Sequence, residues 1–495
     1  MADEPTIRRS LGWAFVLTWG QRAISALFVF VLAAVLGPEA FGIVAMALVF
    51  LALVDLFLEA GFQTTIVQRE NLESEHLDSA FWLNLGLSVV LAAVTFLLAG
   101  WWASVNDAPE LANVLRVMSV LVIVTGLTIT QQGYMHRTFA FRRLAVRANV
   151  AAFVGGLLGL ILALAGAGVW ALVAQQMALA VTSLVLLWAV SDWRPRFRFS
   201  RSHARDLVGF TGGVFLSNLG GFIYRRGDAL LIGLFFTPAV VGVYRLADRF
   251  VDTILEVTLR PVGLVSLPHM SARQKDSQAL RASVGSFIRI TMRTTLPALL
   301  VLAACSDYVL TVIGPEWEVG SDALMLLCVV GIVKGLVHFT GPLLFAAARP
   351  YSRAAMLWFL AAINVVTVVL VGRALENDEA TTQLTGMAGA RAVIATAVVI
   401  PLNLLVISRV AGLGPREIAR WLPGPLLGGV LGIAAVAALT QTGVLEGLAP
   451  FVALVVTAAV AVSVTLALML VLDKDTRRLA QTLLASRRAS LGSGA

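Results

Sequence analysis

The feature that most constrains the fold is a series of apolar segments that recurs along the whole chain of 495 residues. A helix of about 20 apolar residues crosses the hydrocarbon core of a bilayer. Backbone in lipid must satisfy its own hydrogen bonds, which leaves helices for segments of this length. Fourteen such segments are expected, near residues 11–36, 41–66, 80–102, 112–131, 148–166, 168–190, 207–234, 240–267, 286–306, 322–347, 353–372, 384–407, 421–440 and 447–472. The sequence therefore predicts an all-α, polytopic membrane protein.

Composition supports this fold class and excludes several functions. Hydrophobic residues make up 59% of the chain and charged residues only 13%, whereas a soluble domain has about 25% charged residues. The two cysteines, Cys305 and Cys328, both lie in apolar segments, and the five histidines show no ligand spacing. A disulfide framework and a metal site are therefore not predicted. No phosphate-binding glycine loop is present, so neither ATP nor another cofactor is expected.

The distribution of basic residues predicts how the chain crosses the membrane. The apolar segment 11–36, which follows Arg8 and Arg9, is longer than the core of a signal peptide and is interpreted as a first span. With the N-terminus inside, 25 Lys and Arg fall on the inside, 11 within spans and one, Arg373, outside. Basic residues concentrate on the cytoplasmic side of membrane proteins. Both termini are therefore predicted to be cytoplasmic, and the high isoelectric point needs no nucleic-acid partner.

An internal repeat at an offset of 200 residues divides the chain into two halves. The segment 36–50 resembles the segment 236–250, and four identities carry the likeness: Pro38 with Pro238, Gly42 with Gly242, Ala47 with Ala247 and Phe50 with Phe250. Because six spans separate the copies, the two repeats are parallel. Transporters with parallel repeats are common, and they bind substrate between the halves.

The repeat predicts the domain boundaries. We expect a six-helix bundle over 1–191, a basic cytoplasmic linker over 192–206 and a second six-helix bundle over 207–410. Two additional spans over 411–472 and a cytoplasmic tail over 473–495 complete the chain. The linker has two interpretations, an amphipathic interfacial helix or a solvated basic loop, and the loop is favoured.

Charges inside the apolar segments identify the candidate site. A central Arg or Asp in a lipid-exposed helix costs roughly 2.5–3.5 kcal/mol, so such residues face a polar interior. At helical spacing, six charges of the eighth span lie within an arc of roughly 120°. They are Arg245, Asp248, Arg249, Asp252, Glu256 and Arg260. Further charges inside spans are Arg22, Asp55, Glu59, Arg225, Arg226, Asp228, Lys334 and Arg391.

The sign of these charges favours an anionic substrate. The spans of the first half hold two cations and two acids, whereas those of the second half hold nine cations and four acids. Eight of the nine cations are arginine, which binds phosphate in a bidentate manner. We therefore predict that Arg225, Arg226, Arg245, Arg249 and Lys334 bind a phosphate-bearing substrate. The acids Asp55, Glu59, Asp228, Asp248, Asp252 and Glu256 are interpreted as ion-coupling or ion-pairing groups. For all of them the alternative is a structural ion pair or a snorkelling side chain.

Several motifs resemble those of a known transporter family. They are LGPEAFG (36–42), GFQTTIVQR (61–69), HLDSAFWLNL (76–85), RRGDALLIG (225–233) and VGVYRLADRF (241–250). Together they resemble the Wzx-type polysaccharide flippases, in the branch of exopolysaccharide, colanic acid and lipopolysaccharide exporters. That family belongs to the MOP superfamily, with the lipid II flippases and the MATE multidrug exporters.

The resemblance implies a function and a location. It implies translocation of undecaprenyl-pyrophosphate-linked oligosaccharide across the bacterial inner membrane by alternating access. Arg22, together with the four arginines predicted above, would engage the pyrophosphate in a cationic central cavity. The implied partners are the lipid-linked substrate, membrane lipid and the polysaccharide polymerase and export machinery.

Two other functions compete with this interpretation. A cation-coupled drug antiporter of the MATE type would use Asp55, Glu59 or Asp228 to bind Na⁺ or H⁺. The net positive charge of the second half disfavours it. A membrane polymerase or ligase would typically need a large periplasmic loop, and the longest expected outside loop has only about 15 residues. The sugar composition and the coupling ion stay open.

Overall fold

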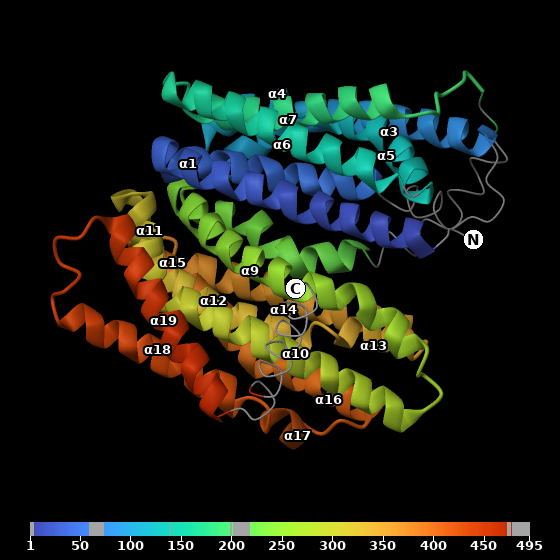
Figure 1. The fold of residues 1–495 in the computed structure, drawn as a ribbon. Helices are drawn as coiled ribbons and strands as arrows, with labels where there is room; N and C mark the ends of the chain where they lie inside the picture. The colour runs from blue at the N-terminus through green and yellow to red at the C-terminus, as the bar shows by residue number, and fades with distance from the viewer. Residues whose placement is uncertain are drawn as a thin grey trace, which may run out of the picture. The chain divides into compact units, whose positions relative to one another are not determined.

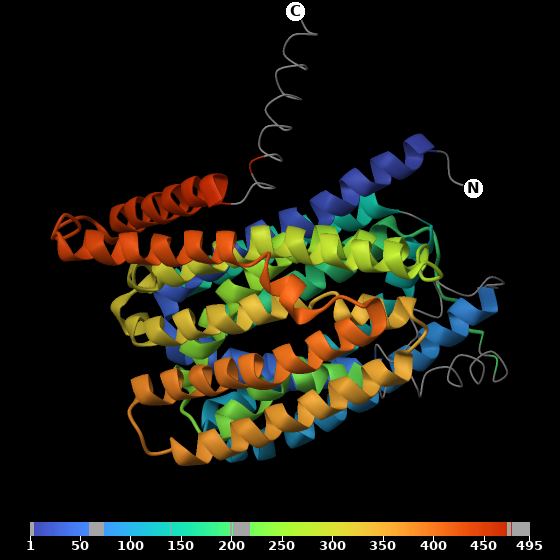
Figure 2. The same ribbon diagram turned by 90° about the horizontal axis from the view of Figure 1, so that it is seen from below.

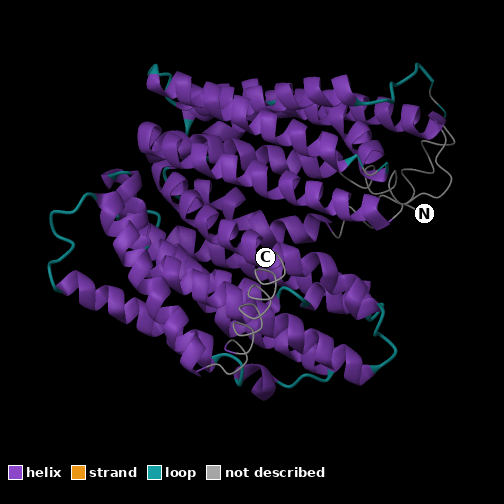
Figure 3. Cartoon of the chain, viewed as in Figure 1, coloured by secondary structure: helices purple, strands orange, loops and turns teal. Residues whose placement is uncertain are grey.

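The computed structural model describes residues 4–58, 74–138, 140–198, 200, 218–472 and 477. Every regular element among these residues is a helix (Figure 3), which confirms the predicted all-α class. The first half contains α1 (Glu4–Leu58), α3 (Ser74–Val105), α4 (Pro109–Met118), α5 (Val120–Arg137), α6 (Phe141–Leu164) and α7 (Val169–Val190).

A helix over 218–231 opens the second half. It is followed by η1 (Ile232–Leu234), α9 (Pro238–Ser271), α10 (Ser277–Ala304), α11 (Ser306–Ile313), η2 (Pro315–Gly320), α12 (Ser321–Val337) and α13 (Thr340–Ala346). The chain continues through α14 (Pro350–Ala374), α15 (Ala380–Ile394), the π-helical turn η3 (Ala395–Val399), α16 (Ile400–Ala411), α17 (Pro415–Ala419), α18 (Pro423–Gln441) and α19 (Pro450–Leu472).

The described residues hold eleven helical segments that are long and apolar enough to cross a membrane. One of them, Ala23–Leu58, covers the first two expected spans. Within α1 two helices follow each other directly, joined by a kink at Gly37. Gly37 has a left-handed φ of 73°, which glycine adopts without strain, and Pro38 begins the next helix. The seventh and eighth expected spans correspond to the helix 218–231 and to α9, so fourteen spans are consistent with the structure.

The structure divides into two compact units. Unit 1 comprises residues 1–243 and 361–372, and unit 2 comprises 244–360 and 373–495. The domain boundaries expected from the repeat, 1–191, 192–206, 207–410, 411–472 and 473–495, stay a prediction. Most of the tail lies outside the described residues.

Unit 1 is built on close helix contacts that small residues permit. α6 packs along both α1 and α7, and α3 packs along α5 (Figure 1). A Cβ added at Gly156 of α6 would lie 2.0 Å from the ring of Phe28 on α1. The absence of a side chain there lets the two helices approach, as small residues do in membrane proteins generally.

The two copies of the repeat meet in a reciprocal backbone contact within unit 1. A Cβ on Gly42 would lie 1.7 Å from the carbonyl oxygen of Pro238. A Cβ on Gly242 would lie 1.9 Å from the carbonyl oxygen of Pro38. Each copy thus presents the same glycine to the same proline of the other copy. Such a self-complementary contact is what a local two-fold relation between parallel repeats produces.

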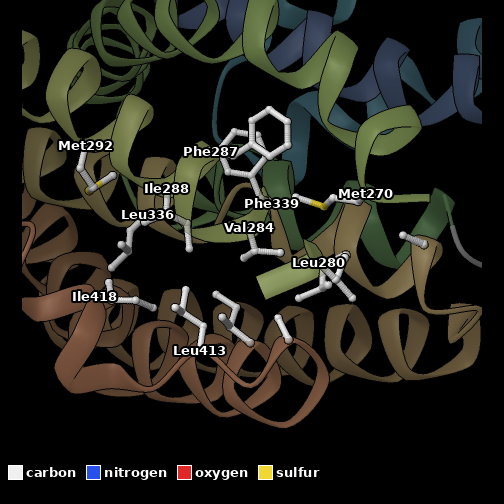
Figure 4. Close-up of a cluster of buried hydrophobic side chains, with 14 of the residues drawn as sticks. Met270, Leu280, Val284, Phe287, Ile288, Met292, Leu336, Phe339, Leu413 and Ile418 are labelled. Atoms are coloured by element: carbon white, nitrogen blue, oxygen red, sulfur yellow. The ribbon is translucent and has the colours of Figure 1, made fainter. Parts of the chain in front are cut away.

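Unit 2 packs around an apolar cluster contributed by α9, α10, α12, α13, α16 and α17 (Figure 4). Its members include Met270, Val284, Phe287, Phe339 and Ile418, all of them buried. The last two helices, α18 and α19, pack against each other and against α10, and Figure 2 shows them as adjacent rods. This core supports α9 and α12, two of the helices that carry the charges, and α15 packs along α12.

Candidate functional site

A buried carboxylate, Asp248 of α9, is the centre of an ion-pair network in unit 2. Its residue is only 5% exposed. Arg245 Nη1 lies 3.3 Å from Asp248 Oδ2, one helical turn away on the same helix. Arg391 Nη1 of α15 lies 3.6 Å from Asp248 Oδ1, and Lys334 Nζ of α12 lies 3.9 Å from the same oxygen. Three helices therefore each contribute one cationic side chain that lies close to the same carboxylate.

A second carboxylate extends the network along α9. Lys334 Nζ donates a hydrogen bond to Asp252 Oδ1 at 3.2 Å. Asp252 lies four residues after Asp248, so the two acids lie on the same face of the helix. These five residues are three cations and two acids, so the set carries one positive charge in excess. The network is therefore both internally paired and cationic.

Arg391 is fixed more tightly than the other cations. Its Nη1 donates a 2.7 Å hydrogen bond to the hydroxyl of Tyr244, whose side chain is completely buried. The guanidinium also lies 5.8 Å from the centroid of the Tyr244 ring, within the range of a cation–π interaction. Only 10% of the Arg391 side chain is exposed. Tyr244 and Asp248 thus hold Arg391 at the closed end of the network.

Exposure rises from Asp248 towards Asp252. The exposed fractions are 7% for the Asp248 side chain, 24% for Arg245, 33% for Lys334 and 45% for Asp252. Arg249, on the adjoining face of α9, is exposed, and Glu256 is half-buried. Burial makes ion pairs hard to break, and solvent access makes them exchangeable. Lys334, Asp252 and Arg249 are therefore more accessible to solvent than Asp248.

The remaining predicted residues belong to unit 1. Arg225 and Arg226 are exposed on the helix 218–231, and Asp228 of the same helix is buried. Asp55 of α1 is half-buried. Arg22 lies in α1 but its side chain is outside the described part, and Glu59 lies outside the described residues altogether. The carbonyl of Tyr224 accepts a hydrogen bond from Asn364 Nδ2 at 3.3 Å, which ties the helix 218–231 to the unit-1 part of α14.

The structure thus brings four of the predicted residues together, Arg245, Asp248, Asp252 and Lys334. It adds Arg391, which the sequence marks only as the charge of the twelfth span. The only sequence signal for a role of Arg391 was its position as a charged residue in an otherwise apolar span. Among the described residues, no group of three or more His, Cys, Asp or Glu side chains is placed to hold a metal ion.

Comparisons with known proteins identify relatives of this chain. A family model described as polysaccharide biosynthesis protein matches residues 31–322. The chain is 27% identical over 460 residues to the succinoglycan biosynthesis transport protein ExoT of Rhizobium meliloti, covering 87% of this chain and 92% of that protein. It is 26% identical to the lipopolysaccharide biosynthesis protein WzxC of Escherichia coli, covering 64% of this chain and 65% of that protein. It is 25% identical to the teichuronic acid biosynthesis protein TuaB of Bacillus subtilis, covering 59% of this chain and 62% of that protein.

Solved structures show the same fold. The lipid II flippase MurJ in an inward closed conformation matches with a TM-score of 0.74 at 12% identity, over 93% of this chain and 99% of that one. An inward-facing MATE multidrug transporter of the MOP superfamily matches with a TM-score of 0.60 at 17% identity, over 81% of this chain and 98% of that one. The predicted MOP fold is thereby confirmed.

Proposed function

The chain belongs to the polysaccharide biosynthesis protein family, and we propose that it is a flippase for undecaprenyl-pyrophosphate-linked oligosaccharide. The observation that carries this proposal is the cationic ion-pair network of α9, α12 and α15, in a multi-pass membrane protein. ExoT, whose match covers 87% of this chain, is named as a transport protein of succinoglycan biosynthesis. Family and site chemistry therefore point to the same class of substrate, a lipid-linked, anionic saccharide.

The network suits reversible binding of a pyrophosphate. Lys334 is paired with Asp252, whose side chain is 45% exposed, so this pair exchanges its partner at low cost. A phosphate oxygen replaces the Asp252 carboxylate at Lys334 and at the same time meets the exposed Arg249. Asp248 stays between Arg245 and Arg391 and keeps both guanidinium groups in place. Release needs only the return of Asp252, which keeps the affinity moderate, as transport requires.

The other predicted residues complete the proposal. Arg22, Arg225 and Arg226 of unit 1 supply further cationic groups for phosphate. Asp55, Glu59, Asp228 and Glu256 serve in ion coupling or in pairing these arginines. Translocation proceeds by alternating access between the two repeats, as is common for transporters of this architecture.

The location follows from the basic loops. We place the protein in the bacterial inner membrane with both termini in the cytoplasm, because 25 of the 37 Lys and Arg then lie on that side. The polysaccharide polymerase and export machinery take up the product on the other side. The drug-antiporter alternative is disfavoured because the family name implies a role in polysaccharide biosynthesis.

The test is complementation of a strain that lacks the gene. Without the gene, surface polysaccharide disappears and lipid-linked repeat units accumulate in the cytoplasmic leaflet. Lys334→Ala and Arg249→Ala each remove a charged contact worth about 1.5–3 kcal/mol, so export falls at least about tenfold while the protein stays in the membrane. Arg416→Ala, at an exposed position on α17, is the matched control. Full export by both variants would remove the phosphate role, and dye efflux without polysaccharide export would favour the antiporter.

A further inference from the structure

The segment that joins the two halves is held along α3 by specific contacts. Its described part, residues 191–198 and 200, is irregular rather than helical. The backbone N–H of Arg196 donates to Asp78 Oδ1 at 3.1 Å, and that of Ser200 donates to Ser79 Oγ at 3.0 Å. Trp82 Nε1 donates to the carbonyl oxygen of Arg196 at 2.8 Å. The linker is therefore a strap bonded to the start of α3, and we call residues 191–198 the strap.

These contacts give a structural role to the motif HLDSAFWLNL, which has no role in the proposed transport function. Asp78, Ser79, Phe81 and Trp82 all belong to HLDSAFWLNL. The Phe81 ring packs edge-on against Trp193 of the strap, with centroids 6.1 Å apart. The Trp82 ring stacks on Phe197 at 4.8 Å and an interplanar angle of 27°. The motif is thus the docking site of the strap.

The strap presents an aromatic ring at the edge of the lipid-facing side of α3. Phe197 is 93% exposed although it stacks on Trp82. Trp82 shares a helix face with a run of exposed small and apolar residues, namely Gly86, Val89, Val90, Ala93 and Leu97. Trp82 lies seven residues after Glu75, where the span begins, or roughly 10 Å along the helix. Aromatic side chains concentrate at the boundary between headgroups and acyl chains, so we expect Trp82 to lie near that boundary.

Three basic residues lie close to Phe197 in the sequence of the strap. Arg194, Arg196 and Arg198 are exposed, and among the described residues none of them is ion-paired to a carboxylate. The one acid of the strap, Asp192, is already neutralised by Arg143 Nη1 at 2.7 Å. Arg194 Nη1 donates to the carbonyls of Ser191 and Trp193, which fixes its position without removing its charge. The strap therefore carries three unneutralised positive charges at the end of a membrane span.

We propose that the strap and the Trp82 face of α3 form a binding site for an anionic phospholipid. The headgroup phosphate lies among Arg194, Arg196 and Arg198, and the first acyl carbons lie against Phe197. A bilayer lipid fits better than a soluble partner, because the apolar face of the site continues into the lipid-exposed stripe of α3. This site is separate from the network of α9, α12 and α15, and the inference does not rest on the proposed transport function.

The test uses photo-crosslinking in the full-length protein. Phe197 is replaced by benzoyl-phenylalanine, and the protein is reconstituted into vesicles of equal parts phosphatidylglycerol and phosphatidylcholine without polyprenyl lipids. Because a basic residue near an anionic surface contributes about 1 kcal/mol, we expect phosphatidylglycerol adducts to exceed phosphatidylcholine adducts by at least about threefold. The same photoprobe at Val90, an exposed position farther along the same face of α3, should show no preference.

Two variants test the arginine charges and the anchoring of the strap separately. The triple variant Arg194→Gln, Arg196→Gln, Arg198→Gln changes only exposed side chains and should bring the adduct ratio at position 197 to one. Asp78→Ala keeps all three arginines but removes an anchor of the strap, and should also lower the ratio. The proposal is overturned if position 197 gives no lipid adduct, if it captures only protein in cell membranes, or if the triple variant keeps the full preference. An unchanged ratio in Asp78→Ala overturns the role of the anchored strap.

Discussion

Replacing Asp248 by Asn tests whether the network is one buried unit. The substitution keeps the shape of the side chain but removes the charge that Arg245, Arg391 and Lys334 share. Breaking a buried ion pair costs about 3–5 kcal/mol, because the partner charge stays buried. Arg391 meets that description, since its side chain is only 10% exposed. Lys334, at 33% exposure, is partly rehydrated, so we expect the lower end of the range, about 3 kcal/mol.

The matched control is the neighbouring acid. Asp252→Asn removes the same charge from the same face of α9, but the Asp252 side chain is 45% exposed. Pairs open to solvent contribute about 0–1 kcal/mol, so this variant should keep nearly the wild-type stability. The measurement is the apparent melting temperature of the detergent-solubilised protein, together with the free energy of unfolding in denaturant.

A double-mutant cycle separates the pair from other effects. Asp248→Asn is combined with Arg391→Met, which removes the guanidinium and retains an apolar side chain of similar length. If the two residues interact as the 3.6 Å separation indicates, the double variant is more stable than the sum of the single effects by about 1–3 kcal/mol. Equal destabilisation by Asp248→Asn and Asp252→Asn, or a coupling below about 0.5 kcal/mol, would refute the reasoning.

Three further predictions use other parts of the structure. Gly42→Ala places a Cβ 1.7 Å from a proline carbonyl of the second repeat and should abolish folded protein in membranes. Gly86→Ala, with nothing within 4 Å of the new Cβ, should accumulate normally by immunoblot. Tyr244→Phe removes the 2.7 Å hydrogen bond to a charged partner and should lower the free energy of unfolding by about 1.5–3 kcal/mol, measured in denaturant. Cys305 and Cys328 are buried free thiols, so maleimide should label both only after denaturation, and rapid labelling of native protein would contradict their placement.

Sequence reasoning found the charged helices because a charge in an apolar segment is visible without any contact information. The stripe on α9 could be read from helical spacing alone, and Lys334 could be read as a charge inside a span. The partner of Asp248 on α15 could not be identified, because the Arg391 pairing depends on how α9, α12 and α15 pack. The linker shows the same limit. Its basic residues predict a solvated cytoplasmic loop, but its hydrogen bonds to Asp78 and Ser79 depend on tertiary position.

The acids within a site for an anion have a physical purpose. Arg245, Arg391 and Lys334 carry like charges on neighbouring helices, and without an acid between them they would repel one another in a poorly hydrated interior. Asp248 removes that repulsion permanently because it is buried, whereas Asp252 does so only until another anion arrives. The difference in exposure between two carboxylates one turn apart therefore assigns them different roles. In the proposed mechanism, Asp248 maintains the positions of the cations, and Asp252 keeps Lys334 available to a phosphate.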